Sequence, residues 1–254
     1  MINLYFFGCS LTAGDELSDD IFFPWKETCK SGEEYYQRRN KFLLDDDLST
    51  RYEESNLALA YPALINDDVY KTYSYAKNGA SLRENIYRIL KLIYENNDIG
   101  AIFLQLPPPG REMHIVGKDF VTTLRFSDAK ITITDKEDAV GQYINAKLMS
   151  HSNRQYSLED LMDLLMLNSL ARQKNIKLCI INITNQLPLR LEDMQGSSEF
   201  QFISDNLLKE IDLINLPRHL MKEHTLAGHI NKSAHQEFAK IIKAMLPNIL
   251  NLQA

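Results

Sequence analysis

The chain has 254 residues, of which 44% are hydrophobic and 24% charged, and its formal net charge is -6. This composition is typical of a globular protein. The negative charge disfavours a broad electrostatic surface for nucleic acid or an anionic membrane, while leaving room for a local basic patch, and the longest apolar runs are far shorter than a membrane span.

The first predicted element is a buried strand over residues 2–7, apolar and aromatic apart from Asn3. It ends at Gly8, and the small, turn-forming residues 10–14 follow. In an open α/β sheet, ligands and catalytic groups lie just beyond the carboxyl ends of the strands. Ser10 is therefore a candidate catalytic residue, with an ordinary strand-to-loop exit as the alternative.

The first residues and the cysteines indicate the cellular compartment of the protein. No Lys or Arg precedes Cys9, and only a handful of apolar residues do, so this segment predicts a strand and not an export signal. Cys9, Cys29 and Cys179 have scattered spacings that fit neither a metal site nor an even disulfide framework. We expect a reduced, cytoplasmic protein without a metal site, with export that uses no cleaved signal as the alternative.

Residues 15–56 form a long polar stretch that is rich in acids and aromatics and has little periodicity. We expect an insertion that acts as a cap, a substrate-side loop or a partly mobile segment, with a solvated decoration as the alternative. The basic residues of 37–41 lie beside Tyr35 and Tyr36, but their surroundings are too acidic to indicate nucleic-acid binding.

Strands and helices alternate over the rest of the chain. We predict strands at 68–76, 101–106 and 175–184, a short helix at 57–65 and a β-hairpin at 114–135. Three helices are predicted from serines followed at the spacing of a capping box, Ser81 with Glu84, Ser157 with Asp160, and Ser233 with Gln236. This order predicts one α/β domain over 1–254, with a parallel sheet covered on both faces and insertions at about 15–56 and 114–135.

Hydrolysis by a serine requires a nucleophile, a base within hydrogen-bond reach and donors for the oxyanion. His114 opens the hairpin and His151 lies between helices, so neither is directed at the end of the first strand. His229 lies in the loop 227–231 before the last helix, where we expect the carboxyl edge of the sheet, and it is the candidate base. For His235, in the first turn of that helix, we expect a structural role.

Three short segments, in the right order along nearly the whole chain, resemble the SGNH or GDSL-like hydrolase family. Residues 7–14 (FGCSLTAG) resemble the Gly-Asp-Ser-Leu turn that holds the nucleophile, here Ser10. Residues 75–81 (YAKNGAS) offer Gly79, whose amide would bind the oxyanion together with the amide of Ser10. GHIN, with His229, resembles the histidine block. The resemblance implies a flavodoxin-like three-layer α/β/α sandwich.

The chain departs from the family pattern near the nucleophile. Cys9 stands where an aspartate usually precedes the serine; Cys9 as nucleophile is the alternative, although a buried strand end suits an inert thiol. Prolines at 107–109 replace the segment whose asparagine donates to the oxyanion, and proline has no amide hydrogen. Arg111 or Gln105 is the candidate for this contact or for one to substrate, with an ion pair to a neighbouring acid as the alternative for Arg111.

The acid that orients the histidine is also missing. Leu226 stands where the family pattern Asp-x-x-His has its aspartate. Glu223 is the candidate orienting acid, with Asp212 further away, and a dyad that uses a backbone carbonyl is the alternative. Because loss of the orienting acid lowers the rate, weak or absent activity is compatible with this sequence.

The resemblance implies a serine esterase of the SGNH type that needs no cofactor and acts on a small acyl ester. O-acetyl groups on carbohydrate fit the range of the family, and the insertions at about 15–56 and 114–135 are where specificity is expected. We expect no nucleic-acid partner and no membrane partner, and the oligomeric state stays open. The alternatives are an inactive binding protein with the same fold and an acyltransferase that uses the same serine.

Overall fold

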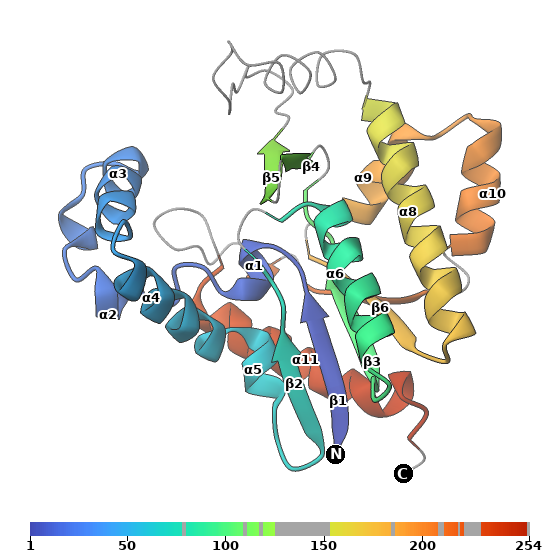
Figure 1. Ribbon diagram of the computed structural model, residues 1–254, viewed down its shortest axis with the longest axis horizontal. Coiled ribbons are helices and arrows are strands. Elements are labelled where there is room, and N and C mark those ends of the chain that lie inside the picture. Colours follow the sequence, from blue (N-terminus) through green and yellow to red (C-terminus); the bar gives the residue numbers. More distant parts are fainter. Residues whose placement is uncertain are drawn as a thin grey trace.

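The computed structural model describes residues 1–77, 80–108, 111–116, 119–124, 153–183, 186–207, 211–217, 219–220 and 230–252. In this part of the chain, five strands form a parallel sheet in the order β2-β1-β3-β6-β7 (Figure 1). The strands are β1 (Ile2–Phe7), β2 (Tyr70–Ser74), β3 (Ala101–Gln105), β6 (Lys177–Asn182) and β7 (Asp212–Asn215). The predicted parallel sheet is confirmed, although β7 was not anticipated.

Side chains along β1 alternate between two cores, as the period of a strand requires. Leu4 and Phe6 are buried in the first core, whereas Tyr5 and Phe7 are buried in the second. Figure 1 shows helices on both faces of the sheet. The first core includes α5 (Tyr61–Ile65) and α11 (Lys232–Ile249), and the second includes α6 (Leu82–Glu95) and α8 (Asn153–Gln173). The three-layer α/β/α sandwich is confirmed.

The polar stretch at 15–56 consists mostly of helices, which its weak periodicity did not predict. Its elements, with the short helix that precedes them, are α1 (Ser10–Ala13), α2 (Asp19–Phe22), η1 (Lys26–Thr28), α3 (Gly32–Phe42) and α4 (Asp46–Leu59). Two of these helices begin at residue types that commonly cap helices. The Ser31 side chain accepts a hydrogen bond from the Glu34 amide at the start of α3, and the Asp45 side chain accepts one from the Leu48 amide at the start of α4. The predicted helix at 57–65 is in fact the end of α4 and all of α5, separated at Ala60.

The predicted helix caps have mixed outcomes. Ser81 Oγ accepts from the Glu84 amide at 3.1 Å, as predicted. Ser157 is wrong as a cap, because α8 begins earlier, at Asn153, and Ser157 Oγ instead donates to Asp193 Oδ2 at 2.6 Å. Ser233 is also wrong, because Asn231 caps α11 by accepting from the Ala234 amide. An asparagine two residues earlier is as good a cap as serine.

The predicted hairpin is confirmed where the structure describes it. β4 (Arg111–Val116) pairs antiparallel with β5 (Asp119–Leu124), so the first strand begins three residues before the predicted start at 114. Residues 125–135 of the predicted hairpin lie outside the described residues. The organisation into one domain with two insertions stays a prediction. No described helix is long and apolar enough to cross a membrane.

Candidate active site

A tight turn places Ser10 at the carboxyl end of β1. The Cys9 carbonyl accepts from the amides of Thr12 and Ala13, both at 3.0 Å, and this starts the single-turn helix α1 with Ser10 as its first residue. Ser10 is half-buried. Gly8 has no room for a side chain, since a Cβ there would lie 2.3 Å from Thr12 Oγ1. The strand end therefore packs directly on α1.

Gln105, at the end of β3, holds this turn from the next strand. Its side chain is fully buried, and its Oε1 accepts from the Cys9 amide at 3.2 Å, from Cys9 Sγ at 3.1 Å and from Thr12 Oγ1 at 3.3 Å. Its Nε2 donates to the Leu106 carbonyl. These contacts give Gln105 a positioning role beneath Ser10, whereas a contact to the oxyanion stays a prediction.

Cys9 and His235 both have structural contacts. Cys9 is 1% exposed and donates its thiol to Gln105, an environment that suits an inert thiol better than a nucleophile. His235, expected to be structural, is also 1% exposed, and its Nδ1 accepts from the Tyr61 amide at 3.0 Å. The Tyr61 hydroxyl in turn lies 3.0 Å from Thr12 Oγ1. The first turn of α11 is thus connected to α1 through Tyr61.

The segment that leads to Gly79 runs beside the Ser10 turn. The Tyr75 amide donates to the Phe6 carbonyl at 2.8 Å, and the Lys77 amide donates to the Gly8 carbonyl at 3.2 Å. Gly79 itself lies outside the described residues. The structure therefore brings the start of the second predicted segment to the first, while the oxyanion role of Gly79 stays a prediction.

The remaining predicted site residues cannot be placed against Ser10. His229 and Glu223 lie outside the described residues, and so does Leu226. Arg111 begins β4, but its side chain is also outside them. The base, the orienting acid and the contact from Arg111 stay predictions. Among the described residues, no group of three or more His, Cys, Asp or Glu is arranged to hold a metal ion.

Sequence reasoning missed Arg190, which anchors the segment after β3. It lies on α9 (Gln186–Asp193) and is fully buried. Its Nη2 donates to the Pro107 carbonyl at 3.0 Å, and its Nε pairs with Asp160 Oδ2 at 2.7 Å. Burial raises the pKa of Asp160, and the adjacent guanidinium acts in the opposite direction. The only signal in the sequence was a lone arginine within the apolar run 187–191.

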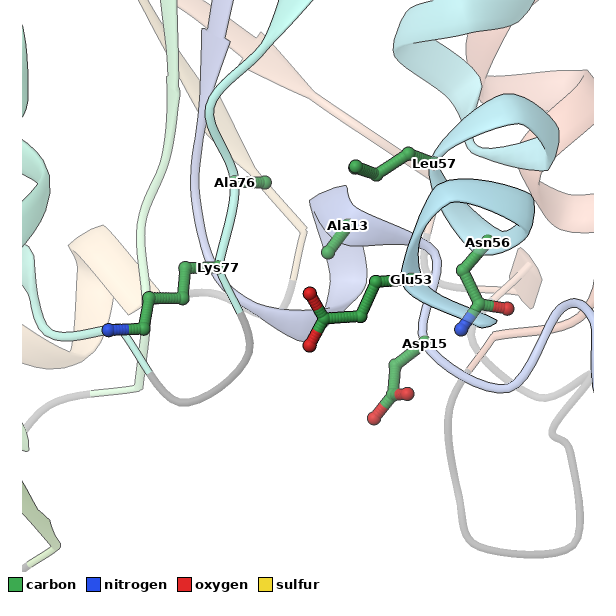
Figure 2. A pocket seen from close by; sticks show the side chains of 7 residues that line it. All are labelled: Ala13, Asp15, Glu53, Asn56, Leu57, Ala76 and Lys77. Atoms are coloured by element: carbon green, nitrogen blue, oxygen red, sulfur yellow. The ribbon is translucent and has the colours of Figure 1, made fainter. Parts of the chain in front are cut away.

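A pocket of about 140 Å³ lies beside α1 (Figure 2). It is lined by Ala13, Asp15, Glu53, Asn56, Leu57, Ala76 and Lys77. Ala13 follows Ser10 by three positions, so the two side chains are neighbours on one face of α1. In Figure 2 Asp15 and Glu53 lie on one side of the pocket, whereas the Lys77 side chain extends away from them. The helical stretch from 15 to 59 thus supplies one wall of a pocket at α1, the single-turn helix that begins with Ser10.

Behind this pocket lies a buried polar network. Arg39 Nη2 and Asp15 Oδ1 are 2.5 Å apart, and both side chains are less than 10% exposed. Asp19 accepts from the hydroxyls of Tyr35 and Tyr52. Burial, followed by the hydrogen bond to Asp19, raises the pKa of Tyr35 far above its ordinary value. The network ties α2, α3 and α4 to the residues that follow α1.

Asp19 makes a pH effect on stability predictable. Burial raises its pKa, against the lowering effect of the hydrogen bonds from Tyr35 and Tyr52. The folded chain then keeps this proton to a higher pH than the unfolded chain. The stability that this proton contributes is fully present below the pKa of Asp19 in the unfolded chain. It is lost as the pH rises through the pKa of Asp19 in the folded chain. The free energy of unfolding of the wild type, minus that of Asp19→Asn, should therefore decrease as the pH rises above the pKa of an unfolded aspartate, about 3.9.

Urea denaturation at each pH measures this difference. Asp20→Asn is the matched control, because the Asp20 side chain is 83% exposed. The free energy of unfolding of Asp20→Asn should depend on pH in the same way as that of the wild type. A wild-type advantage over Asp19→Asn that grows with pH would contradict the prediction.

Comparisons with known proteins support the fold. No family model matches the sequence, and no curated protein matches it. A carbohydrate esterase whose active site is described as having divergent catalytic and non-catalytic binding functions matches with a TM-score of 0.55 and 12% identity, over 98% of this chain and 70% of that one. An acetyl xylan esterase, Est2A, from the rumen bacterium Butyrivibrio proteoclasticus matches with a TM-score of 0.55 and 14% identity, over 98% of this chain and 64% of that one. This chain therefore has their α/β sandwich fold and spans only part of their length.

Proposed function

We propose that this chain, whose α/β sandwich is also the fold of two carbohydrate-active esterases, is a serine esterase of the SGNH type. The substrate class would be a small acyl ester, with O-acetyl groups on carbohydrate as the first candidate. The observation that carries the proposal is the turn at Ser10. Gly8 permits its close packing, Gln105 holds it through three hydrogen bonds, and Ala13 of the same single-turn helix lines a pocket.

The mechanism assigns each step to a named group. Ser10 Oγ attacks the acyl carbon while His229 takes the hydroxyl proton. The amides of Ser10 and Gly79 hold the oxyanion, with Arg111 as the further candidate donor. The intermediate collapses to an acyl-enzyme as His229 gives its proton to the leaving alcohol. Water, activated by His229, then attacks the acyl-enzyme and releases the acid and free Ser10, and no cofactor takes part.

The histidine needs an orienting group, and the usual aspartate position holds Leu226. Glu223 is the candidate, and a backbone carbonyl would leave a serine–histidine dyad. Leu226 and the prolines after β3 are also the specific observations that favour the second candidate, a non-catalytic protein that binds a ligand in the same place.

The proposal includes a location of the protein in the cytoplasm.

Labelling with a fluorophosphonate tests the nucleophile directly, because this probe reacts with activated serines. We expect mass spectrometry to locate the adduct on Ser10 of the wild type. Ser10→Ala should not be labelled, and His229→Ala should be labelled more slowly. Hydrolysis of a chromogenic acetyl ester by Ser10→Ala should fall by at least about 10³-fold.

The exposed Ser198 offers a matched control, since Ser198→Ala should be labelled like the wild type. Folded wild type that shows no adduct at several pH values would overturn the esterase proposal. The non-catalytic binding protein would then be the better interpretation.

A further inference from the structure

A second, larger cleft lies on the other side of residues 75–77 from the pocket at α1. It has a volume of about 440 Å³, within the range typical of ligand sites. It runs between the end of the edge strand β2 and helix α6. The charged and aromatic residues of its lining are Tyr75, Lys77, Arg88, Lys91 and Glu95. The proposed function uses none of these five.

A buried carboxylate holds two cations at this cleft. Glu84 Oε1 lies 3.2 Å from Lys77 Nζ and 2.7 Å from Arg88 Nη2, and its side chain is only 2% exposed. Arg88 Nη1 also donates to the Tyr75 carbonyl at 3.1 Å. The Lys77 side chain is 51% exposed and that of Arg88 28%. Two positive charges thus share one buried negative charge and remain accessible to a ligand.

A third cation is held only loosely. Lys91 Nζ lies 3.9 Å from Glu95 Oε1, and both side chains are more than half exposed. Such a surface pair contributes little, so Lys91 can turn toward an anion in the cleft. With Glu84 and Glu95 counted, the five charged groups sum to one positive charge, in a chain whose formal net charge is -6. The cleft is therefore locally cationic.

Tyr75 adds a flat apolar surface beside these charges. It is 45% exposed, and it stacks on Phe7 with ring centroids 5.3 Å apart and an interplanar angle of 11°. Tyr5 lies further away, at 6.2 Å. A ring held in such a stack loses little further freedom when a ligand packs against it. An aromatic surface next to cations suits a sugar ring that carries a carboxylate.

The cleft shares two lining residues with the pocket at α1. Ala76 and Lys77 line both cavities, and the Lys77 amide is bonded to the Gly8 carbonyl, two residues before Ser10. The two cavities differ in their charged lining, because the exposed Glu53 presents a carboxylate to the pocket at α1, where the Asp15 carboxylate is already paired with Arg39. Glu53 disfavours an anionic unit in that pocket, whereas Arg88 and Lys91 favour one in the cleft. This difference favours one direction for a chain lying across residues 75–77.

We propose that the cleft is a carbohydrate subsite for a uronate residue, next to the neutral, acetylated residue that is presented to Ser10. This inference rests on the proposed esterase function and narrows its substrate class to acidic polysaccharide. The carboxylate of the uronate would contact Lys91 and Arg88, and the sugar ring would pack on Tyr75.

Binding to the full chain carrying Ser10→Ala tests the subsite without turnover. Isothermal titration calorimetry with a trimer of galacturonic acid, and with the uncharged xylotriose, should show at least about tenfold tighter binding of the acidic trimer at low salt. Added Lys91→Met should weaken binding of the acidic trimer about fivefold and leave xylotriose unchanged. Tyr75→Ala should weaken both. Arg88→Met should also weaken binding of the acidic trimer, but it loses the contacts of Arg88 with Glu84 and with the Tyr75 carbonyl. If that variant fails to fold, Lys91→Met alone tests the role of charge.

Lys240→Met is the matched control, since Lys240 is an exposed lysine on α11 in a similar pair with Glu237. It should bind the acidic trimer as before. Equal affinity for the two trimers, or equal weakening by Lys240→Met and Lys91→Met, would overturn the subsite. The two proposals can fail separately: Ser10 labelling without trimer binding removes only the subsite, and trimer binding without labelling removes only the esterase.

Discussion

Arg39→Met should lower the free energy of unfolding by about 3–5 kcal/mol, the usual effect of breaking a buried ion pair by removing one partner. Arg39 and Asp15 are 2.5 Å apart, and their side chains are 9% and 7% exposed. The methionine would fill much of the space but would leave Asp15 buried without the guanidinium. Asp19, whose pKa this cation also lowers, would lose it as well. Chemical denaturation in urea measures the loss.

Two variants separate charge from packing. Arg38→Met removes a neighbouring arginine that is 43% exposed and lies over the Trp25 ring, so it should cost less than about 1 kcal/mol. The double variant Asp15→Asn with Arg39→Met should regain part of the loss, because it no longer buries a charge without its partner. If Arg39→Met is as stable as Arg38→Met, the ion pair does not hold α3 to the residues after α1.

Gly8→Ala should destabilise the fold by about 1–3 kcal/mol and slow labelling of Ser10 by about 100-fold. The Cβ would lie 2.3 Å from Thr12 Oγ1 and 2.9 Å from Gln105 Oε1. Thr12 cannot give way easily, because its hydroxyl contacts both Tyr61 and Gln105. The backbone of the turn must therefore move, and Ser10 moves with it. Urea denaturation and the rate of fluorophosphonate labelling measure the two effects.

Gly196→Ala is the matched control for this substitution. Gly196 has a φ of 78°, and a Cβ there would meet no atom within 4 Å. It should therefore lose only about 1–2 kcal/mol through backbone strain and be labelled like the wild type. Gly8 does not have a positive φ, so its effect comes from contact alone. Wild-type labelling of Gly8→Ala would show that close packing of this turn does not position Ser10.

The comparison of sequence and structure separates local from long-range information. The apolar run 2–7 specified β1 and the position of Ser10 after it, and Ser81 with Glu84 specified the start of α6. These signals are local, because a period of two or a cap at three residues acts within a few residues of chain. The helices between 15 and 59 carried cap signals as well, but their polar surfaces hid the helical period. Their stability comes from a network that includes Arg39 and Asp15, which are 24 residues apart.

Only the tertiary structure decided what surrounds the serine. The sequence placed Gln105 at the end of a strand, but the direction of its amide depends on Cys9, 96 residues away. Likewise, Arg190 reaches the Pro107 carbonyl across 83 residues. Such contacts form because a buried polar group must find a partner wherever the fold brings one, and no local pattern records that choice. The sequence by itself therefore determined that Ser10 follows a buried strand and that helices and strands alternate after it. The tertiary structure determined which groups hold Ser10 in place.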